Sequence, residues 1–399
     1  MSSTEIRKTP APYGQSCANC VRAKCRCILR EGGTCERSVY STHGKAYLVS
    51  MSGLARSLIS DLRLDNPPHS AGCPSIGPIV EEKPPRTNEE RRALLACFAL
   101  SAIVCLTIKH DPMRWSAQVE EACHRLIVDA ETEGDKVLAY AARIARLCVN
   151  AAGISRRAAE EPVFGRHAIL QVGALKAALE QLKSELPSDV SEHSAVVAYL
   201  YSAEAGIYEL ALYHHSASLP ISTHSPSSSN PKLESRRVAY LTTLLLVCQS
   251  CIEFFLASDV TYCMTSSMLA FSYCIKIAYK LQILKIPGWD AAIVRSVVDP
   301  VRCLERAAQA AEAGNEVLKA RTGEDSVFKN AAEHLWKSAP LWRVNFDAEQ
   351  AAGMEGNVGM HSGVAEPVSF SGGGGELNGS LIDTEIASDF WLSGTFNFY

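Results

Sequence analysis

A long succession of apolar segments with a helical period occupies the sequence from about residue 88 to residue 343. In "DKVLAYAARIARLCVNAAG" (135–153) the apolar residues recur every three or four positions, so they line one face of a helix. No stretch of the block alternates apolar and polar residues for long enough to indicate a sheet. The sequence therefore predicts an all-α domain over 88–343. The apolar face of 135–153 comprises Val137, Leu138, Ala141, Ile144, Ala145 and Cys148.

Acidic helix starts, prolines and polar breaks divide this block into separate helices. The longest apolar run, 93–108, has 16 residues, fewer than the roughly 20 that a helix needs to cross a bilayer. We therefore expect it to be a buried helix, and we expect no membrane partner. The predicted helices lie at 88–110, 113–131, 135–153, 166–186 and 189–215, with two more inside 236–285, one near 290–321 and one near 325–338.

The chain contains 15 cysteines, and most of them sit in the apolar helical segments. A reduced thiol in such a place behaves as a small apolar side chain. Residues 1–16 contain no apolar run, so we expect no signal peptide, and an odd cysteine total favours free thiols. These features predict a reducing compartment, the cytosol or the nucleus. The helical cysteines are Cys97, Cys105, Cys123, Cys148, Cys248, Cys251, Cys263, Cys274 and Cys303.

The N-terminal cysteines follow a different pattern, C-x2-C-x6-C-x7-C. A C-x2-C pair supplies two zinc ligands from a tight turn, and tetrahedral Zn²⁺ needs four. Basic residues stand between the second and third cysteines, where a short helix held by metal would present them as one edge. Such an edge can contact guanine and phosphate groups in a major groove. The predicted zinc ligands are Cys17, Cys20, Cys27 and Cys35, and the predicted DNA-binding residues are Arg22, Lys24 and Arg26.

The stretch "CANCVRAKCRC…CER" is similar to the first two-thirds of the fungal binuclear zinc cluster, the six-cysteine DNA-binding domain of fungal transcription factors. The resemblance covers about 20 residues, and it places Lys24 where the family has a base-contacting lysine. It implies a nuclear transcription regulator that recognises CGG-like sites, as a dimer in many members. In some members the regulated genes belong to a neighbouring secondary-metabolite pathway. The helical block from 90 to 127 resembles, more loosely, the helical regulatory region of such factors.

The sequence departs from the family pattern directly after Cys35. Ser38 stands where the fifth cysteine of the family belongs, and no cysteine follows until Cys73. Four thiolates can still hold one Zn²⁺, with His43 as an alternative ligand. An incorrect exon boundary over 38–86 is another explanation of the departure. The alternative function is a helical co-regulator that binds proteins, forms homo- or heterodimers, and no longer binds DNA.

Charge is distributed unevenly along the chain. Residues 1–50 carry eight Lys and Arg against three Asp and Glu, whereas eight acidic and no basic residues follow Arg343. Acids interleaved with apolar residues over 381–399 are typical of activation segments that recruit the transcription machinery. A disordered tail, or a tail that binds its own domain, is the alternative. The expected organisation is a disordered start (1–16), the zinc module (17–37), a linker (38–87), the helical domain (88–343) and a flexible acidic-hydrophobic tail (344–399).

An α-helical enzyme is a third hypothesis, which the missing motifs argue against. The sequence has no D-D-x-x-D motif for magnesium and diphosphate, and no G-x-G-x-x-G, G-x-x-x-x-G-K or G-x-S-x-G. His214 and His215 are adjacent and therefore point to different faces of a helix, which argues against a shared metal site. We therefore expect a non-enzymatic protein with Zn²⁺ as its cofactor and DNA as its partner.

Overall fold

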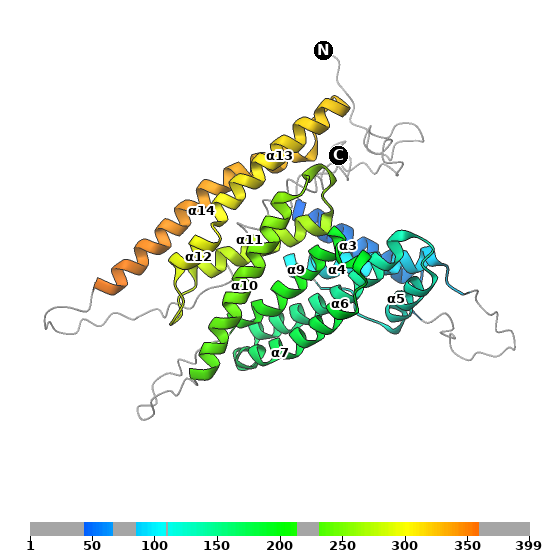
Figure 1. The fold of residues 1–399 in the computed structure, drawn as a ribbon, viewed down its shortest axis with the longest axis horizontal. Helices are drawn as coiled ribbons and strands as arrows, with labels where there is room; N and C mark the ends of the chain where they lie inside the picture. Colours follow the sequence, from blue (N-terminus) through cyan, green and yellow to red (C-terminus); the bar gives the residue numbers. More distant parts are fainter. Residues whose placement is uncertain (1–43, 67–84, 109–110, 214–230, 359–399) are drawn as a thin grey trace, which may run out of the picture. The chain divides into compact units, whose positions relative to one another are not determined.

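The structure, a computed structural model, describes residues 44–66, 85–108, 111–213 and 231–358. Within these ranges every regular element is a helix, which confirms the mainly α-helical prediction (Figure 1). The helices are α3 (Gly44–Asp61), α4 (Asn88–Ile108), α5 (Ala117–Asp129), α6 (Glu133–Glu160), α7 (Pro162–Glu185), α8 (Ser188–Ser191), α9 (Ser194–Glu209), η1 (Leu210–Tyr213), α10 (Pro231–Ala257), η2 (Val260–Tyr262), α11 (Thr265–Ile283), α12 (Ala291–Val297), α13 (Pro300–Thr322) and α14 (Val327–Val358).

The chain divides into two compact units. One is Met51–Cys303, and the other comprises Leu304 onwards together with the residues up to Ser50. In the first unit α6 packs against α4, α5, α7 and α9, while α11 packs against α4, α9 and α10 (Figure 1). Phe255 of α10 and Phe271 of α11 stack with ring centroids 4.4 Å apart. Burial of such apolar faces is the main stabilising term for the bundle.

Side chains next to the helices define several of the boundaries. Ser116 accepts a hydrogen bond from the Val119 amide and caps α5. Thr132 and Asp135 form a reciprocal capping box at the start of α6. Pro162 stands in the first turn of α7. Backbone N–H groups in the first turn make no hydrogen bond within the helix, so a proline, which lacks the N–H, is tolerated there. These local signals explain why α5, α6 and α7 remain separate helices despite short connections.

Gly206 marks the closest approach of four helices. A Cβ atom at this position of α9 would lie 3.2 Å from Cδ2 of Leu106, 3.5 Å from the hydroxyl of Tyr273 and 3.6 Å from Cβ of Ala151. These neighbours belong to α4, α11 and α6. The small residue therefore lets α9 pack closely between them.

Replacing Gly206 by valine is expected to lower the free energy of unfolding by about 2 kcal/mol, because the added methyl groups overpack a filled site. Urea denaturation measures the change. Gly153→Val is the matched control, since nothing lies within 4 Å of a Cβ at that position of α6. An equal loss in both variants would show that helix propensity, not packing around Gly206, determines the result.

The second unit contains an antiparallel pair, α13 and α14. Asn315 closes the turn: its Oδ1 accepts hydrogen bonds from the Ser326 amide at 2.7 Å and from the Ser326 hydroxyl at 2.9 Å. Asp325 in the same turn accepts from Lys319 at 3.0 Å and Lys329 at 2.8 Å. Hydrogen bonds from Lys329, Lys319 and Asn315 hold the pKa of Asp325 well below its usual range. The connection is therefore well fixed by polar contacts.

Helix α14 continues to Val358, so the helix end predicted near 338 is wrong. Pro340 follows the predicted end; it lacks an amide hydrogen and removes one backbone hydrogen bond. Pro340 lies on the exposed side of the helix, whereas Leu335, Trp342 and Phe346 are buried. Burial on both sides of the proline maintains the helix, and the helical part of the chain extends past Arg343.

In the part of the chain that the structure describes, three helices are long and apolar enough, by length and composition, to cross a membrane. They are α4, α6 and the segment Lys232–Ala257 of α10. In the structure 61%, 61% and 44% of their most apolar windows are buried within the protein. Packing inside the bundle therefore accounts for most of the apolar surface of α4 and α6.

Candidate functional site

The residues predicted to bind zinc and DNA lie outside the described part of the chain. So do His43, the histidine pair 214–215 and the acidic-apolar segment 381–399. Among the described residues there is no group of three or more His, Cys, Asp or Glu side chains placed to hold a metal ion. The ligand set Cys17, Cys20, Cys27 and Cys35 and the basic residues Arg22, Lys24 and Arg26 therefore remain predictions from sequence.

The helical cysteines are free thiols, and all but Cys97 and Cys263 are buried. Burial raises the pKa of Cys105 to about 11 and that of Cys123 to about 12. The Cys105 and Cys123 thiols are therefore protonated at neutral pH, when they are poor metal ligands and poor nucleophiles. They pack as small apolar side chains, as the sequence predicts.

Helix α3 forms part of the chain between the cysteine module and the helical domain. Ile59 and Leu64 are buried, at 5% and 4% exposure, and attach the end of α3 to the first unit. Arg56 donates a hydrogen bond to the carbonyl of Asp111. Arg86 donates to the carbonyl of Arg63 at 2.9 Å. The residues from 51 to 66 are therefore held against the helical bundle.

In the sequence of 47–62, Leu48, Met51, Leu54, Leu58 and Leu62 have the spacing of a short amphipathic helix, which predicts an apolar stripe on α3. In the structure the described members of this stripe face outward. Met51, Leu54, Leu58 and Leu62 are between 45% and 62% exposed, whereas Ser52 is buried. A helical period alone gives the spacing of a stripe but does not determine whether it faces the core or solvent. The packed side of α3 is the adjacent one, which carries Ser52 and Ile59.

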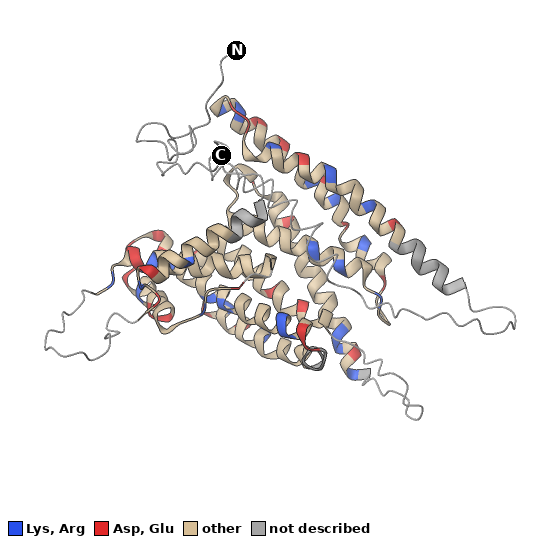
Figure 2. Ribbon diagram, turned by 180° about the vertical axis from the view of Figure 1, so that it is seen from behind, with Lys and Arg blue, Asp and Glu red and all other residues tan. Residues whose placement is uncertain are grey.

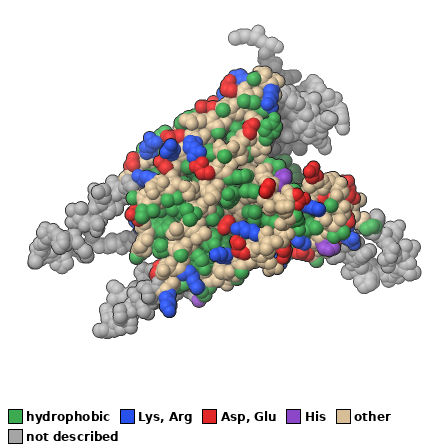
Figure 3. Space-filling model, in the orientation of Figure 1, with side chains coloured by type: hydrophobic (Ala, Val, Ile, Leu, Met, Phe, Trp, Pro, Cys, Tyr) green, Lys and Arg blue, Asp and Glu red, His purple; other side chains and the backbone are tan. Residues whose placement is uncertain are grey.

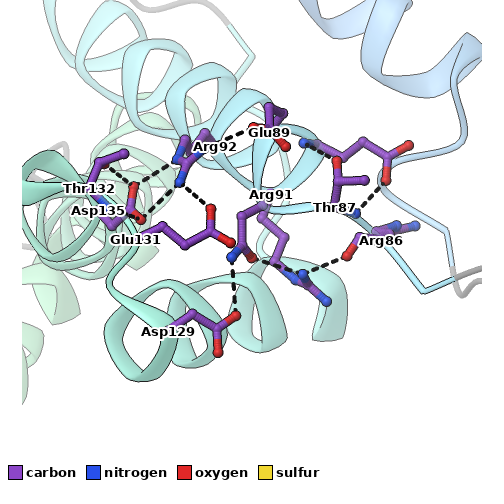
Figure 4. A network of polar contacts seen from close by, with 11 residues as sticks. Arg86, Thr87, Glu89, Arg91, Arg92, Asp129, Glu131, Thr132 and Asp135 are labelled. Atoms are coloured by element: carbon purple, nitrogen blue, oxygen red, sulfur yellow. Dashed lines mark hydrogen bonds and ion pairs between the residues drawn. The ribbon is translucent and has the colours of Figure 1, made fainter.

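A polar network connects the start of α4 with the α5–α6 connection (Figure 4). Arg92 of α4 donates from Nε and Nη2 to the two carboxylate oxygens of Asp135 at 2.7 and 3.0 Å, and from Nη2 to Glu131 at 2.8 Å. Asp135 also accepts from the Thr132 amide at 3.0 Å and from its hydroxyl at 2.6 Å. Figure 2 shows acidic and basic residues gathered at this end of the bundle. The Asp135 carboxylate therefore joins α4, the α5–α6 connection and the start of α6.

Arg91, the preceding residue, makes a second set of contacts in the network. It donates to the Arg86 carbonyl at 2.6 Å and to Oδ1 of Asn88 at 2.9 Å, and it pairs with Glu121 of α5 at 3.2 Å. Asn88 in turn donates to Asp129 at 3.2 Å. Sequence reasoning identified these charges only as a helix start. Glu121 lies 30 residues from Arg91, and Asp129 lies 41 residues from Asn88, so helical periodicity does not reveal these partners.

Electrostatics explain the stability of the Arg92–Asp135 pair. Hydrogen bonds from Arg92, then those from Thr132, hold the pKa of Asp135 far below its usual range. Hydrogen bonds to Asp135 and Glu131 raise the pKa of Arg92 further. Asp135 is 1% exposed, so its charge is buried but fully compensated. The arrangement is suited to holding the fold, and its polar atoms already satisfy one another.

A second buried polar group lies inside the bundle at Glu209. Its carboxylate accepts a hydrogen bond from the Tyr273 hydroxyl at 2.6 Å and pairs with Lys280 at 3.2 Å. Burial, then the charge of Glu209, raises the pKa of Tyr273 well above its usual value. Both partners come from α11, so the group joins the end of α9 to α11. Tyr273 and Lys280 therefore compensate the buried negative charge of Glu209 in the core.

Comparisons with known proteins give two similarities. The family model ATEG07667_C, described as a C-terminal domain, matches residues 262–397. Over 283 residues the chain is 27% identical to a protein of Penicillium oxalicum named "Transcription factor opdL". That alignment covers 66% of this chain and 47% of the relative, so the chain spans about half the length of the curated protein it matches. No solved structure matches the chain.

Proposed function

We propose that the chain is a zinc-dependent, sequence-specific DNA-binding transcription regulator of the fungal zinc-cluster kind. The observation that carries the proposal is the pattern C-x2-C-x6-C-x7-C with three basic residues between its second and third cysteines. The similarity to a protein named as a transcription factor supports it. Four thiolates match the preference of Zn²⁺ for soft tetrahedral ligands, so Cys17, Cys20, Cys27 and Cys35 would hold one ion.

The proposal assigns separate roles to the other parts of the chain. The helical units would serve regulation and the formation of homo- or heterodimers. The acidic tail would recruit the transcription machinery in the nucleus. CGG-like target sites and control of a secondary-metabolite pathway follow from the family resemblance. No enzymatic role is proposed, since the buried carboxylates of Asp135 and Glu209 each accept hydrogen bonds from side chains of the fold.

A second candidate is a co-regulator that acts through protein contacts alone. Ser38, in the place of a fifth cysteine, is the observation that favours it. A serine hydroxyl is a poor zinc ligand beside a thiolate, so a second metal ion would lack ligands. On this hypothesis the helical units act without DNA binding, and the basic residues of the N-terminal module contact nothing specific.

Selection from a random DNA pool distinguishes the two candidates. The full-length protein is loaded with Zn²⁺ and incubated with the pool at moderate salt, because nonspecific binding falls steeply with ionic strength. Enrichment of a defined motif, lost when a chelator removes the metal, is the expected result. Bound zinc without any enriched motif would leave the co-regulator as the better account.

Substitution of Lys24 by alanine is expected to reduce discrimination between the selected site and random DNA by about tenfold, because a base-contacting side chain is lost. Zinc content should stay the same, since lysine is not a ligand in this module. Lys8→Ala, which removes a lysine outside the cysteine pattern, is the control. Equal weakening on specific and random DNA would refute the base-reading role of Lys24. Titration of both DNAs at one salt concentration gives the comparison.

A further inference from the structure

The outward side of α14 carries exposed apolar side chains, and we call this surface the α14 face. Trp336, Leu341 and Val344 are 37%, 54% and 65% exposed. Trp336 donates its indole N–H to Glu312 of α13 at 2.8 Å, so its orientation is fixed. Figure 3 shows apolar and basic side chains next to one another along the α13–α14 edge. The exposed residues between Glu333 and Asp347 are Trp336, Lys337, Pro340, Leu341, Arg343 and Val344.

We propose that the α14 face binds residues 381–398 of the same chain. This segment has the complementary composition: Asp383, Glu385 and Asp389 stand among nine apolar residues, and it contains no Lys or Arg. The α14 face carries Lys337 near its middle, while Arg343 already pairs with Glu305 of α13 at 3.0 Å. The exposed acids Glu333 and Asp347 stand at the two ends of the face. Contact would bury apolar surface on both partners and bring a carboxylate of the segment near Lys337.

The similarity to a known domain supports the pairing independently. The domain matched over 262–397 includes all of α14 and the segment from Leu381 to Asn397. The face and its proposed occupant are therefore parts of one recognised C-terminal domain. A segment that acted only as an external recruiting tail would have no need to belong to the same domain as α13 and α14.

The length of the connection allows the contact within one chain. Residues 359–380 separate the end of α14 from the segment, and 22 residues reach up to about 70 Å when extended. Val344 lies 14 residues before Val358, which is about 21 Å along a helix. The segment can therefore return to the α14 face. A tether of this length gives an effective concentration of order mM, so weak intrinsic affinity is enough.

The consequence for recruitment rests on the function proposed above. Aromatic residues held on the α14 face are not accessible to an external protein, so binding would limit recruitment until a competitor displaces the segment. The binding itself requires neither zinc nor DNA.

Hydrogen–deuterium exchange on the full-length protein tests the contact. In the double variant Leu341→Glu/Val344→Glu, two exposed positions of the α14 face become negatively charged. They would then repel the carboxylates of the acidic segment. Amide exchange across 381–397 is expected to become about tenfold faster than in the wild type. Leu170→Glu is the matched control, since Leu170 is 56% exposed on α7 of the other unit. Equal exchange over 381–397 in the wild type and the double variant would overturn the proposal, provided the melting temperatures agree.

A cross-linking experiment identifies the occupant directly. A photoreactive benzophenone amino acid in place of Leu341 is activated in a mixture of isotope-labelled and unlabelled full-length protein. Cross-links from position 341 to 381–398 with matching labels are the expected result. Mixed-label peptides would assign the face to a second copy, and cross-links elsewhere would assign it to another surface; both overturn the proposal. Neither readout depends on DNA binding, so failure of the proposed function would be recognised separately.

Discussion

Replacing Cys27 by alanine is expected to abolish stoichiometric zinc binding and to remove at least about a thousandfold of specific DNA affinity, down to the nonspecific level. Three thiolates do not complete a tetrahedral site, and a small zinc module has little core to fold around without its metal. The basic residues would lose the scaffold that presents them as one edge. Zinc content by atomic spectroscopy and DNA titration at fixed salt measure the two effects.

The neighbouring cysteine provides a strict control. Cys25 lies inside the same stretch but occupies a position between ligands in the pattern. Cys25→Ala should therefore keep zinc and specific DNA binding. Full zinc content in the Cys27 variant would contradict the ligand assignment, whereas loss of zinc in both variants would place Cys25 among the ligands. The melting of the helical bundle should be the same in both, because its thiols lie in α4 and later helices.

Helical periodicity predicted the bundle because the buried faces of its helices are encoded locally. In α6 the residues expected to face the core include Ala141, Ile144, Ala145 and Cys148, and all are at most 3% exposed. The break between α5 and α6 was visible as well, since Thr132, Glu133 and Gly134 interrupt the apolar pattern. Such features depend on residues within a turn or two of one another.

Features that depend on distant partners were not predictable in the same way. The stripe of α3 was recognised by its spacing, but its exposure depends on which side contacts the bundle. The helix end predicted before Pro340 is overridden by burial of Trp342 and Phe346. For the zinc module, sequence pattern supplies ligand identity but no geometry, because its residues fall outside those that the structure describes.

Arg92 and Asp135 are in contact although they lie 43 positions apart in the sequence. Removing this contact is expected to destabilise the bundle more than any other polar substitution in it. Asp135→Asn keeps the size of the side chain but removes its charge. It weakens two hydrogen bonds from Arg92 and the capping box of α6 together. We expect the free energy of unfolding to fall by about 3 kcal/mol at pH 7.

The same substitution should change how stability depends on pH. The pKa of Asp135 is lowered in the folded protein, by Arg92 first and then by Thr132. The carboxylate therefore stabilises the fold above the unfolded pKa of about 4, and this contribution is lost as pH falls towards the folded pKa. The difference between wild type and Asp135→Asn should be constant from about pH 7 to pH 5 and should shrink below about pH 4.

A matched substitution in the same helix turn separates the network from general charge effects. Glu133→Gln removes a carboxylate that also lies in the first turn of α6 but is exposed. Its cost should be within about 0.5 kcal/mol, the size of a helix-dipole contribution at an exposed site. Urea denaturation of the three proteins across the pH series provides the test. A loss for Asp135→Asn no larger than for Glu133→Gln would mean that Arg92 keeps its position without this carboxylate, supported by Glu131 and Glu89.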